Sequence, residues 1–238
     1  MADHPPLLFS CEHGGNRVPE PYRPLFAGHA DLLHTHRGYD LGILPLARQL
    51  AREFDAPLES AEVTRLLVDL NRSVGHPTLF SFITRDLPAA EKESILRRYY
   101  RPHRQAVEKQ AVRLIASGRP VIHIAIHSFT PELHGQVRNA DIGLLYDPAR
   151  PQEKAFCMAW QRALVKTEPR LGVRRNYPYR GAADSLGTAL RRRFDAGTYL
   201  AIELEINQRL PCEHGDRWQR IKAALSESLG QALRKLTS

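Results

Sequence analysis

The chain has 238 residues, of which 42% are apolar and 25% are charged, and its formal net charge is +8. This composition is that of a globular protein long enough to bury a core, and it excludes an intrinsically disordered chain. The positive surplus favours anionic partners: nucleic acid, a membrane surface or a carboxylated small molecule.

The basic residues do not form one long block. The tightest runs are Arg191–Arg193 and the four arginines within 97–104, and both fall in segments with a helical pattern, so we interpret them as solvated helix faces. No nucleic-acid-binding motif accompanies them, and no apolar run is long enough to span a bilayer. We therefore expect neither nucleic acid nor a membrane as a partner.

The cysteines indicate a reducing compartment. Cys11, Cys157 and Cys212 are an odd number with no closely spaced pair, which disfavours a disulfide framework. The first residues lack the charged-then-apolar pattern of a signal peptide. We expect a cytoplasmic protein.

Apolar, β-branched runs alternate with helical patterns along the chain. We predict strands at 7–11, 64–70, 120–126, 142–146 and 199–206. Three–four spacing of apolar residues predicts helices over 41–54, 89–116, 151–166 and 216–236, and the second of these should break or kink near Pro102. Strands that alternate with helices favour an α/β fold with a largely parallel or mixed sheet. No low-complexity linker divides the chain, so we expect a single domain over residues 1–238.

Polar groups stand where the first strand ends and where the first long helix begins. Glu12 and His13 follow the first strand and precede two glycines, which leave the imidazole on a backbone free to turn. Asp40 directly precedes the helix at 41–54, so it can cap that helix, bind a metal ion, or do both. Asn71 and Arg72 follow the run at 64–70, where a guanidinium beside an amide can hold a carboxylate or form a surface ion pair.

The two central strands carry further groups. His123 and His127 are four residues apart and share one face, so His127 at the carboxyl end is the better ligand and His123 the better core residue. Glu203 and Glu205 also share a face, and carboxylates within an apolar strand are costly unless they are paired or functional.

Two histidines, an acid and a spare glutamate are the groups that a catalytic zinc hydrolase needs. Three protein ligands leave a fourth position for water, and the glutamate moves a proton to the leaving nitrogen. A serine nucleophile is disfavoured because the chain has no Gly-x-Ser-x-Gly elbow. A cysteine nucleophile would pair Cys11 with His13 or Cys212 with His214, but side chains so close along a strand or turn rarely face each other.

Six segments, in order along nearly the whole chain, resemble the N-formylglutamate amidohydrolase family. They are Glu12–Asn16 with Pro19, His36–Gly42, Arg65 with Asp69–Arg72, His127–Pro131, Asn176–Tyr179 and Glu203–Gln208. The Asp-Leu-Asn-Arg, His-Ser and late Glu motifs also look like those of the zinc carboxypeptidases. The resemblance implies a three-layer α/β/α domain with a mixed central sheet, of the phosphorylase/hydrolase-like and zinc-carboxypeptidase-like kind.

The resemblance also implies a metal site. His13 and His127 are expected to bind one Zn²⁺, although manganese, iron or cobalt suits similar donors. The carboxypeptidases place a glutamate three residues after the first histidine, where this chain has Asn16, and an amide is a poor ligand. Asp40 is therefore the expected third ligand, with Glu12 in reserve.

Two of the remaining roles follow from the same resemblance, and those of Arg65, Arg138 and Tyr179 are our own hypotheses. Glu205 is the expected general base, with Glu203 as the alternative, and Asn71 with Arg72 is expected to hold a substrate carboxylate. Arg65 or Arg138 is expected to bind a second carboxylate or the oxyanion. Tyr179 lies in a segment rich in aromatic, proline and glycine residues, which suits a loop over the site.

The expected reaction is hydrolysis of N-formyl-L-glutamate, or of a similarly small anionic N-acyl amino acid, to the free amino acid and a short acid. A metallopeptidase or cell-wall amidase with the same site is the first alternative, and an open groove in place of a closed pocket would favour it. The second alternative is a relative that binds an anionic metabolite without turnover. The sequence leaves the oligomeric state open.

Overall fold

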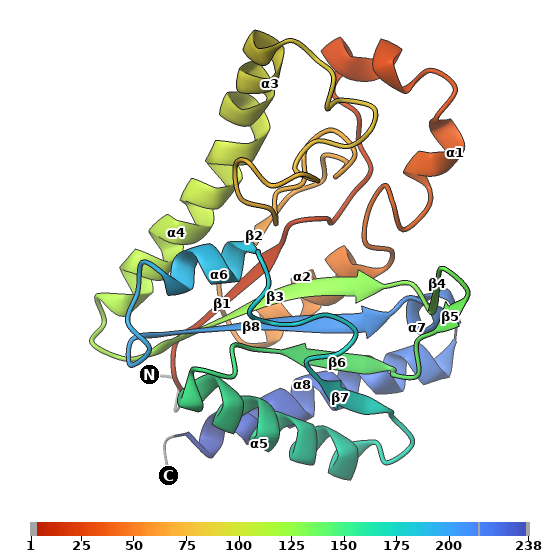
Figure 1. Ribbon diagram of the computed structural model, residues 1–238. Helices are drawn as coiled ribbons and strands as arrows, with labels where there is room; N and C mark the ends of the chain where they lie inside the picture. The colour runs from red at the N-terminus through yellow and green to blue at the C-terminus, as the bar shows by residue number, and fades with distance from the viewer. Residues whose placement is uncertain (1–3, 214, 237–238) are drawn as a thin grey trace.

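The computed structural model of the chain describes residues 4–213 and 215–236. A six-stranded sheet in the order β2-β1-β3-β8-β6-β7 lies between two groups of helices, with a separate lobe beyond one end of its strands (Figure 1). The three-layer α/β/α fold with a mixed central sheet, expected from the sequence, is confirmed.

The sheet consists of four parallel strands and two that run the opposite way. Its strands are β1 (Leu7–Cys11), β2 (Leu58–Ser60), β3 (Val121–Phe129), β6 (Ile142–Leu145), β7 (Val173–Arg175) and β8 (Tyr199–Asn207). β2, β1, β3 and β8 are parallel, whereas β6 pairs antiparallel with β8 and carries β7 parallel to itself. β3 and β8 pair over nine residues each and are buried throughout, as expected of central strands covered on both faces.

Five of the described helices cover the sheet. On one face lie α2 (Ile43–Glu53), α5 (Pro151–Thr167) and α8 (Asp216–Arg234), and on the other lie α4 (Arg101–Ile115) and α6 (Leu186–Arg191). The shorter elements are η1 (Glu20–Phe26), α1 (Ala30–Leu33), α3 (Ala89–Ile95), η2 (Leu96–Tyr100), α7 (Arg209–Cys212) and the hairpin β4 (Glu132–Leu133) with β5 (Gln136–Val137).

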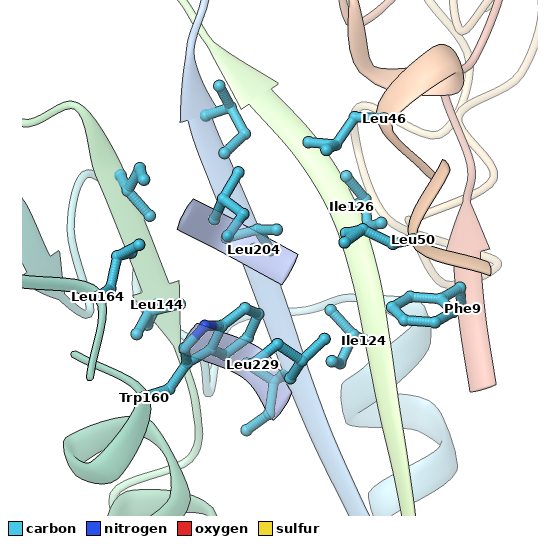
Figure 2. Close-up of a cluster of buried hydrophobic side chains, with 14 of the residues drawn as sticks. Phe9, Leu46, Leu50, Ile124, Ile126, Leu144, Trp160, Leu164, Leu204 and Leu229 are labelled. Carbon is cyan, nitrogen blue, oxygen red and sulfur yellow. The ribbon is translucent and has the colours of Figure 1, made fainter. Parts of the chain in front are cut away.

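The main core lies between the sheet and α2, α5 and α8. Figure 2 shows Phe9, Ile124 and Leu204, from three neighbouring strands, pointing to the side where Trp160 of α5 and Leu229 of α8 lie. Strand side chains alternate between faces, so the odd-numbered residues of β3 and β8 point the other way, toward α4 and α6. Each large apolar side chain buried here contributes about 1.5–3 kcal/mol.

The segment 64–70, expected as a strand, is not one. It consists of turns and irregular backbone, and its leucines belong to a second apolar cluster with Tyr22 of η1 and Ile95 of α3, in the lobe beyond the sheet. A short apolar run is compatible with any buried backbone, and here the run packs against helices. The edge strands β2 and β7 were not predicted, because three residues each give too short a pattern.

Two helical expectations need qualification. The helix expected over 89–116 changes type near Pro102: α3 passes through the π-helical turn η2, and α4 begins at Arg101. Proline lacks the N–H that would continue the regular hydrogen-bond pattern, which accounts for the interruption. Arg191 was wrongly interpreted as part of a solvated face. It is buried, and its Nε lies 3.0 Å from Glu153 Oε1.

Among the residues that the structure describes, no helix combines the length and apolar composition needed to cross a membrane.

Candidate active site

The groups expected to bind a metal come from three separate elements. His13 lies in the turn after β1, Asp40 lies in the loop before α2, and His127 lies near the carboxyl end of β3. The turn holds its shape partly because Gly15 passes close to the next segment, where an added Cβ would lie 2.7 Å from the Glu62 carbonyl oxygen. The Asp40 backbone N–H donates to the His13 carbonyl at 2.9 Å, which brings the two loops together.

Asp40 does not cap α2. The N-cap of that helix is Gly42, in the left-handed conformation, and it makes no side-chain cap. The Asp40 carboxylate instead points into the cluster, where the Ser128 backbone N–H donates to its Oδ2 at 3.2 Å. The capping role is therefore wrong, and the ligand role stays a prediction.

Three nitrogen and oxygen atoms converge in the cluster. Asp40 Oδ2 lies 3.0 Å from His127 Nδ1 and 3.4 Å from His13 Nδ1, and one ligand atom from each of the three residues falls within 4.8 Å of the others. All three residues are buried, and His13 Nδ1 has no hydrogen-bond partner in the described structure. Two imidazoles and a carboxylate, with an orphaned buried nitrogen aimed inward, are a donor set that fits a divalent transition metal.

Asp69 and Arg65 support His13 and Asp40 from the outside. Asp69 Oδ1 lies 2.7 Å from His13 Nε2, so the outer nitrogen of this ring is engaged while Nδ1 faces inward. The Arg65 guanidinium donates to Asp69 Oδ2 at 2.8 Å and to Asp40 Oδ1 at 3.3 Å. Burial opposes the ionised form of Asp69, but Arg65 and His13 outweigh it and hold the pKa of Asp69 well below its usual value.

Glu12 lies beside His127, at the ring nitrogen that faces away from Asp40. Its Oε2 lies 3.1 Å from His127 Nε2, its Oε1 lies 3.5 Å from His103 Nε2 on α4, and the side chain is fully buried. Burial opposes the ionised form here as well, but hydrogen bonding to His103 and His127 keeps the pKa of Glu12 well below its usual value. Glu12 is on the outer side of His127, so it supports a ring and does not belong to the converging cluster.

Asn16 lies away from the cluster. Its side-chain amide donates to the Leu33 carbonyl at 3.1 Å. The deeper histidine of β3 is a core residue, as expected: the two ring nitrogens of His123 lie 2.7 Å from Ser10 Oγ and 2.6 Å from Tyr199 Oη.

Glu205 lies directly across the sheet from His127, in register on the neighbouring strand β8. Its side chain is 4% exposed, and its Oε2 has no hydrogen-bond partner in the described residues. Burial raises the pKa of Glu205 to about 8; His127 opposes the shift, and the nearby Asp40 and Glu203 carboxylates add to it. A carboxyl group that titrates near neutrality can accept and return a proton.

The loop at 176–181 passes over β6 beside Glu205. This close approach requires Gly143, since a Cβ there would lie 2.1 Å from the Tyr177 carbonyl oxygen and 3.1 Å from Glu205 Cβ. Tyr179, at 43% exposure, reaches the cavity from this loop.

These groups surround one cavity of about 280 Å³. It is lined by His13, Asp40, Arg65, Asn71, Arg72, His127, Ser128, Tyr179, Arg180, Ala183, Asp184, Ser185, Glu203 and Glu205. Arg72 donates to the Asp184 backbone carbonyl, and Asn71 accepts from the Leu186 backbone N–H at 2.8 Å.

Arg138 is the one expected site residue that does not line the cavity. Its guanidinium donates to Tyr179 Oη at 3.0 Å and lies over the rings of Phe129 and Tyr179. It therefore reaches the cavity only through Tyr179.

Sequence reasoning missed the supporting role of Asp69 and the position of Arg180 on the cavity wall. Asp69 was visible only as part of the Asp-Leu-Asn-Arg segment, and no local pattern says that its carboxylate reaches a histidine 56 residues away. The cysteine alternative loses support, since burial raises the pKa of the Cys11 thiol well above its usual value; His214 lies outside the described residues.

The α/β/α fold brings histidines, an aspartate and a glutamate around one cavity, which is an arrangement that suits a hydrolase. The family model described as N-formylglutamate amidohydrolase matches residues 5–211. The chain belongs to this family, and with it to the enzymes that hydrolyse amide bonds. A comparison with curated proteins finds no match.

Three solved structures are similar to this chain, and the first two support the fold. A gene product of Agrobacterium tumefaciens is 30% identical, with a TM-score of 0.84 over 98% of this chain and 92% of that one. The N-formylglutamate amidohydrolase of Ralstonia eutropha is 20% identical, with a TM-score of 0.66 over 98% and 96%. A putative carboxypeptidase of Burkholderia mallei is 14% identical, with a TM-score of 0.46 over 99% and 58%.

Proposed function

We propose that the chain is a metal-dependent amidohydrolase that cleaves N-formyl-L-glutamate or a similar small N-acyl amino acid. The observation that carries the proposal is the buried convergence of His13 Nδ1, His127 Nδ1 and Asp40 Oδ2 beside the unpaired carboxyl oxygen of Glu205. An orphaned nitrogen and an orphaned carboxyl oxygen on residues that line one cavity are costly for stability, so their retention favours a catalytic role.

His13, Asp40 and His127 would hold the metal ion. When bound there, Zn²⁺ would supply the Lewis acidity that activates water and polarises the amide carbonyl. The outer nitrogens of the two rings lie 2.7 Å from Asp69 and 3.1 Å from Glu12, which favours an N–H on each outer nitrogen and a free lone pair on each Nδ1.

Glu205 is the proposed general base. It would take a proton from the attacking water and return it to the amide nitrogen as the C–N bond breaks, which yields a carboxylic acid and a free amine. Its burial and its pKa of about 8 suit a group that must do both within one turnover.

Arg72, with Asn71 beside it, is the proposed site for the substrate α-carboxylate. A guanidinium can donate two parallel hydrogen bonds to a carboxylate. Arg65 lies on the cavity wall, fixed by Asp40 and Asp69, and we assign to it the stabilisation of negative charge that develops on the carbonyl oxygen. Tyr179 and, through it, Arg138 would close the cavity over the substrate.

The size of the cavity favours a small substrate over a peptide. About 280 Å³ is at the lower end of the range for small-molecule pockets, so a long peptide or a cell-wall strand would extend well beyond it. A reducing cytoplasm, favoured by the unpaired cysteines, is the proposed location.

The test is formate release from N-formyl amino acids, N-formyl-L-glutamate among them, by protein loaded with Zn²⁺. His127→Ala should lose both the metal and the activity. An absence of turnover with every N-formyl amino acid, in a sample shown to hold one metal per chain, would refute the proposed function.

A further inference from the structure

Glu203 lines the same cavity as Glu205 but has no role in the chemistry derived above. It lies two residues earlier on β8, on the same face, opposite Ala125 of β3 and Leu145 of β6. Only 9% of the surface of Glu203 is exposed.

The Glu203 carboxylate is unpartnered. Within residues 4–213 and 215–236, no hydrogen bond or ion pair holds it. A carboxylate nine-tenths buried and aimed into a cavity is costly unless a donor or a cation pairs with it. The missing partner is therefore expected from the ligand.

Most of the other charges on the cavity wall already have partners. Arg65 is held by two carboxylates, and the Asp184 carboxylate accepts from the backbone N–H and hydroxyl of Ser73 at 2.8 and 2.5 Å. Arg72 and Arg180 remain as cations that a ligand carboxylate can reach. The wall thus offers an anion site and, separately, one buried carboxylate without a partner.

We propose that Glu203 sets substrate specificity by pairing with a cationic side chain, so that the preferred substrate is the N-acyl derivative of a basic amino acid. The inference rests on the proposed function and narrows its substrate class. In such a substrate the α-carboxylate contacts Arg72 or Arg180, the amide carbonyl lies at the His13–Asp40–His127 cluster, and the side-chain ammonium or guanidinium contacts Glu203. A dicarboxylic substrate would leave Glu203 unpaired and bring a further negative charge toward Glu203 and Glu205.

Steady-state kinetics on three substrates test the specificity. Formate release is measured with N-formyl-L-arginine, N-formyl-L-glutamate and N-formylglycine, for the metal-loaded wild type and for Glu203→Gln. Glu59→Gln on β2, which removes the same charge from a residue that does not line the cavity, is the matched control.

We expect the wild type to have a kcat/KM at least tenfold higher for N-formyl-L-arginine than for N-formyl-L-glutamate. Glu203→Gln should reduce the preference for arginine over glycine about tenfold or more, mainly through KM, and Glu59→Gln should preserve that preference. A wild type that prefers N-formyl-L-glutamate overturns the proposal. An equal loss of kcat on all three substrates in Glu203→Gln also overturns it, because Glu203 would then act in the chemical step.

A binding measurement that does not depend on turnover distinguishes a failure of this specificity proposal from a failure of the proposed function. Calorimetry with the metal-loaded protein compares free L-arginine and L-glutamate, the products of the two reactions. L-arginine should bind the wild type more tightly than L-glutamate does, and at least tenfold more tightly than it binds Glu203→Gln. If no N-formyl substrate is hydrolysed but this binding pattern holds, only the proposed reaction fails. If turnover occurs and L-arginine binds both proteins equally, the specificity proposal fails alone.

Discussion

Replacing Glu12 with glutamine should weaken metal binding although Glu12 is not a ligand. Glu12 Oε2 lies 3.1 Å from His127 Nε2 in a fully buried position. An ionised carboxylate can only accept a hydrogen bond, so the N–H must be on His127 Nε2. In the metal-loaded protein Glu12 thereby favours the tautomer with the proton on Nε2, which leaves the Nδ1 lone pair of His127 for the metal ion. An amide at position 12 can donate instead, which would stabilise the opposite tautomer.

The size of the effect follows from the role of such outer carboxylates. Their removal costs about tenfold to a hundredfold in metal affinity, which corresponds to about 1.4–2.7 kcal/mol of binding free energy. The assay is competition for Zn²⁺ with a chelator of known affinity, with Glu59→Gln as the control for the same change of charge. Wild-type zinc affinity in a folded Glu12→Gln protein would refute the assignment.

Three further expectations concern the cavity and its walls. In metal-free protein, Glu205→Gln should be more stable than the wild type at pH 9 and equal to it at pH 4. A carboxyl whose pKa is raised on folding from 4.5 to about 8 lowers the stability as pH rises from the first value to the second, and the loss is complete above about 8. Melting temperatures that differ equally at both pH values would contradict this. Arg72→Ala should raise KM for N-formyl amino acids about tenfold to a hundredfold, and an unchanged KM would contradict the carboxylate assignment. Gly143→Ala should destabilise the fold by about 1–3 kcal/mol, because the new Cβ would lie 2.1 Å from the Tyr177 carbonyl oxygen. Urea unfolding measures this change, and wild-type stability in the variant would contradict the reasoning.

The sequence predicted the parts of the fold that depend on long, regular patterns. The central strands at 120–126 and 199–206 were placed to within three residues of β3 and β8, because nine-residue buried strands leave a clear apolar run. The run at 64–70 is equally apolar, but it lies in turns. What distinguishes it is packing against η1 and α3, which is a tertiary property.

For the site, the sequence predicted well which residues would lie together. It predicted less well which hydrogen-bond and ion-pair partners each of them would have. His13, Asp40 and His127 converge although 27 and 87 residues separate Asp40 from the two histidines, and the motif resemblance had singled out all three. The direction of Glu12, toward the outside of His127, depends on the turn after β1 and on His103 of α4. A residue pattern cannot supply that kind of long-range geometry.

The central claim is that the three-residue cluster holds a metal ion while Glu205 moves the proton. Metal content and formate release, measured side by side for the wild type and for Glu205→Gln with an N-formyl amino acid that the wild type hydrolyses, test it most directly. We expect one metal ion per chain in both proteins and a loss of turnover of about a hundredfold to ten-thousandfold in the variant. A variant that keeps its turnover, or one that loses the metal together with the activity, would contradict the account.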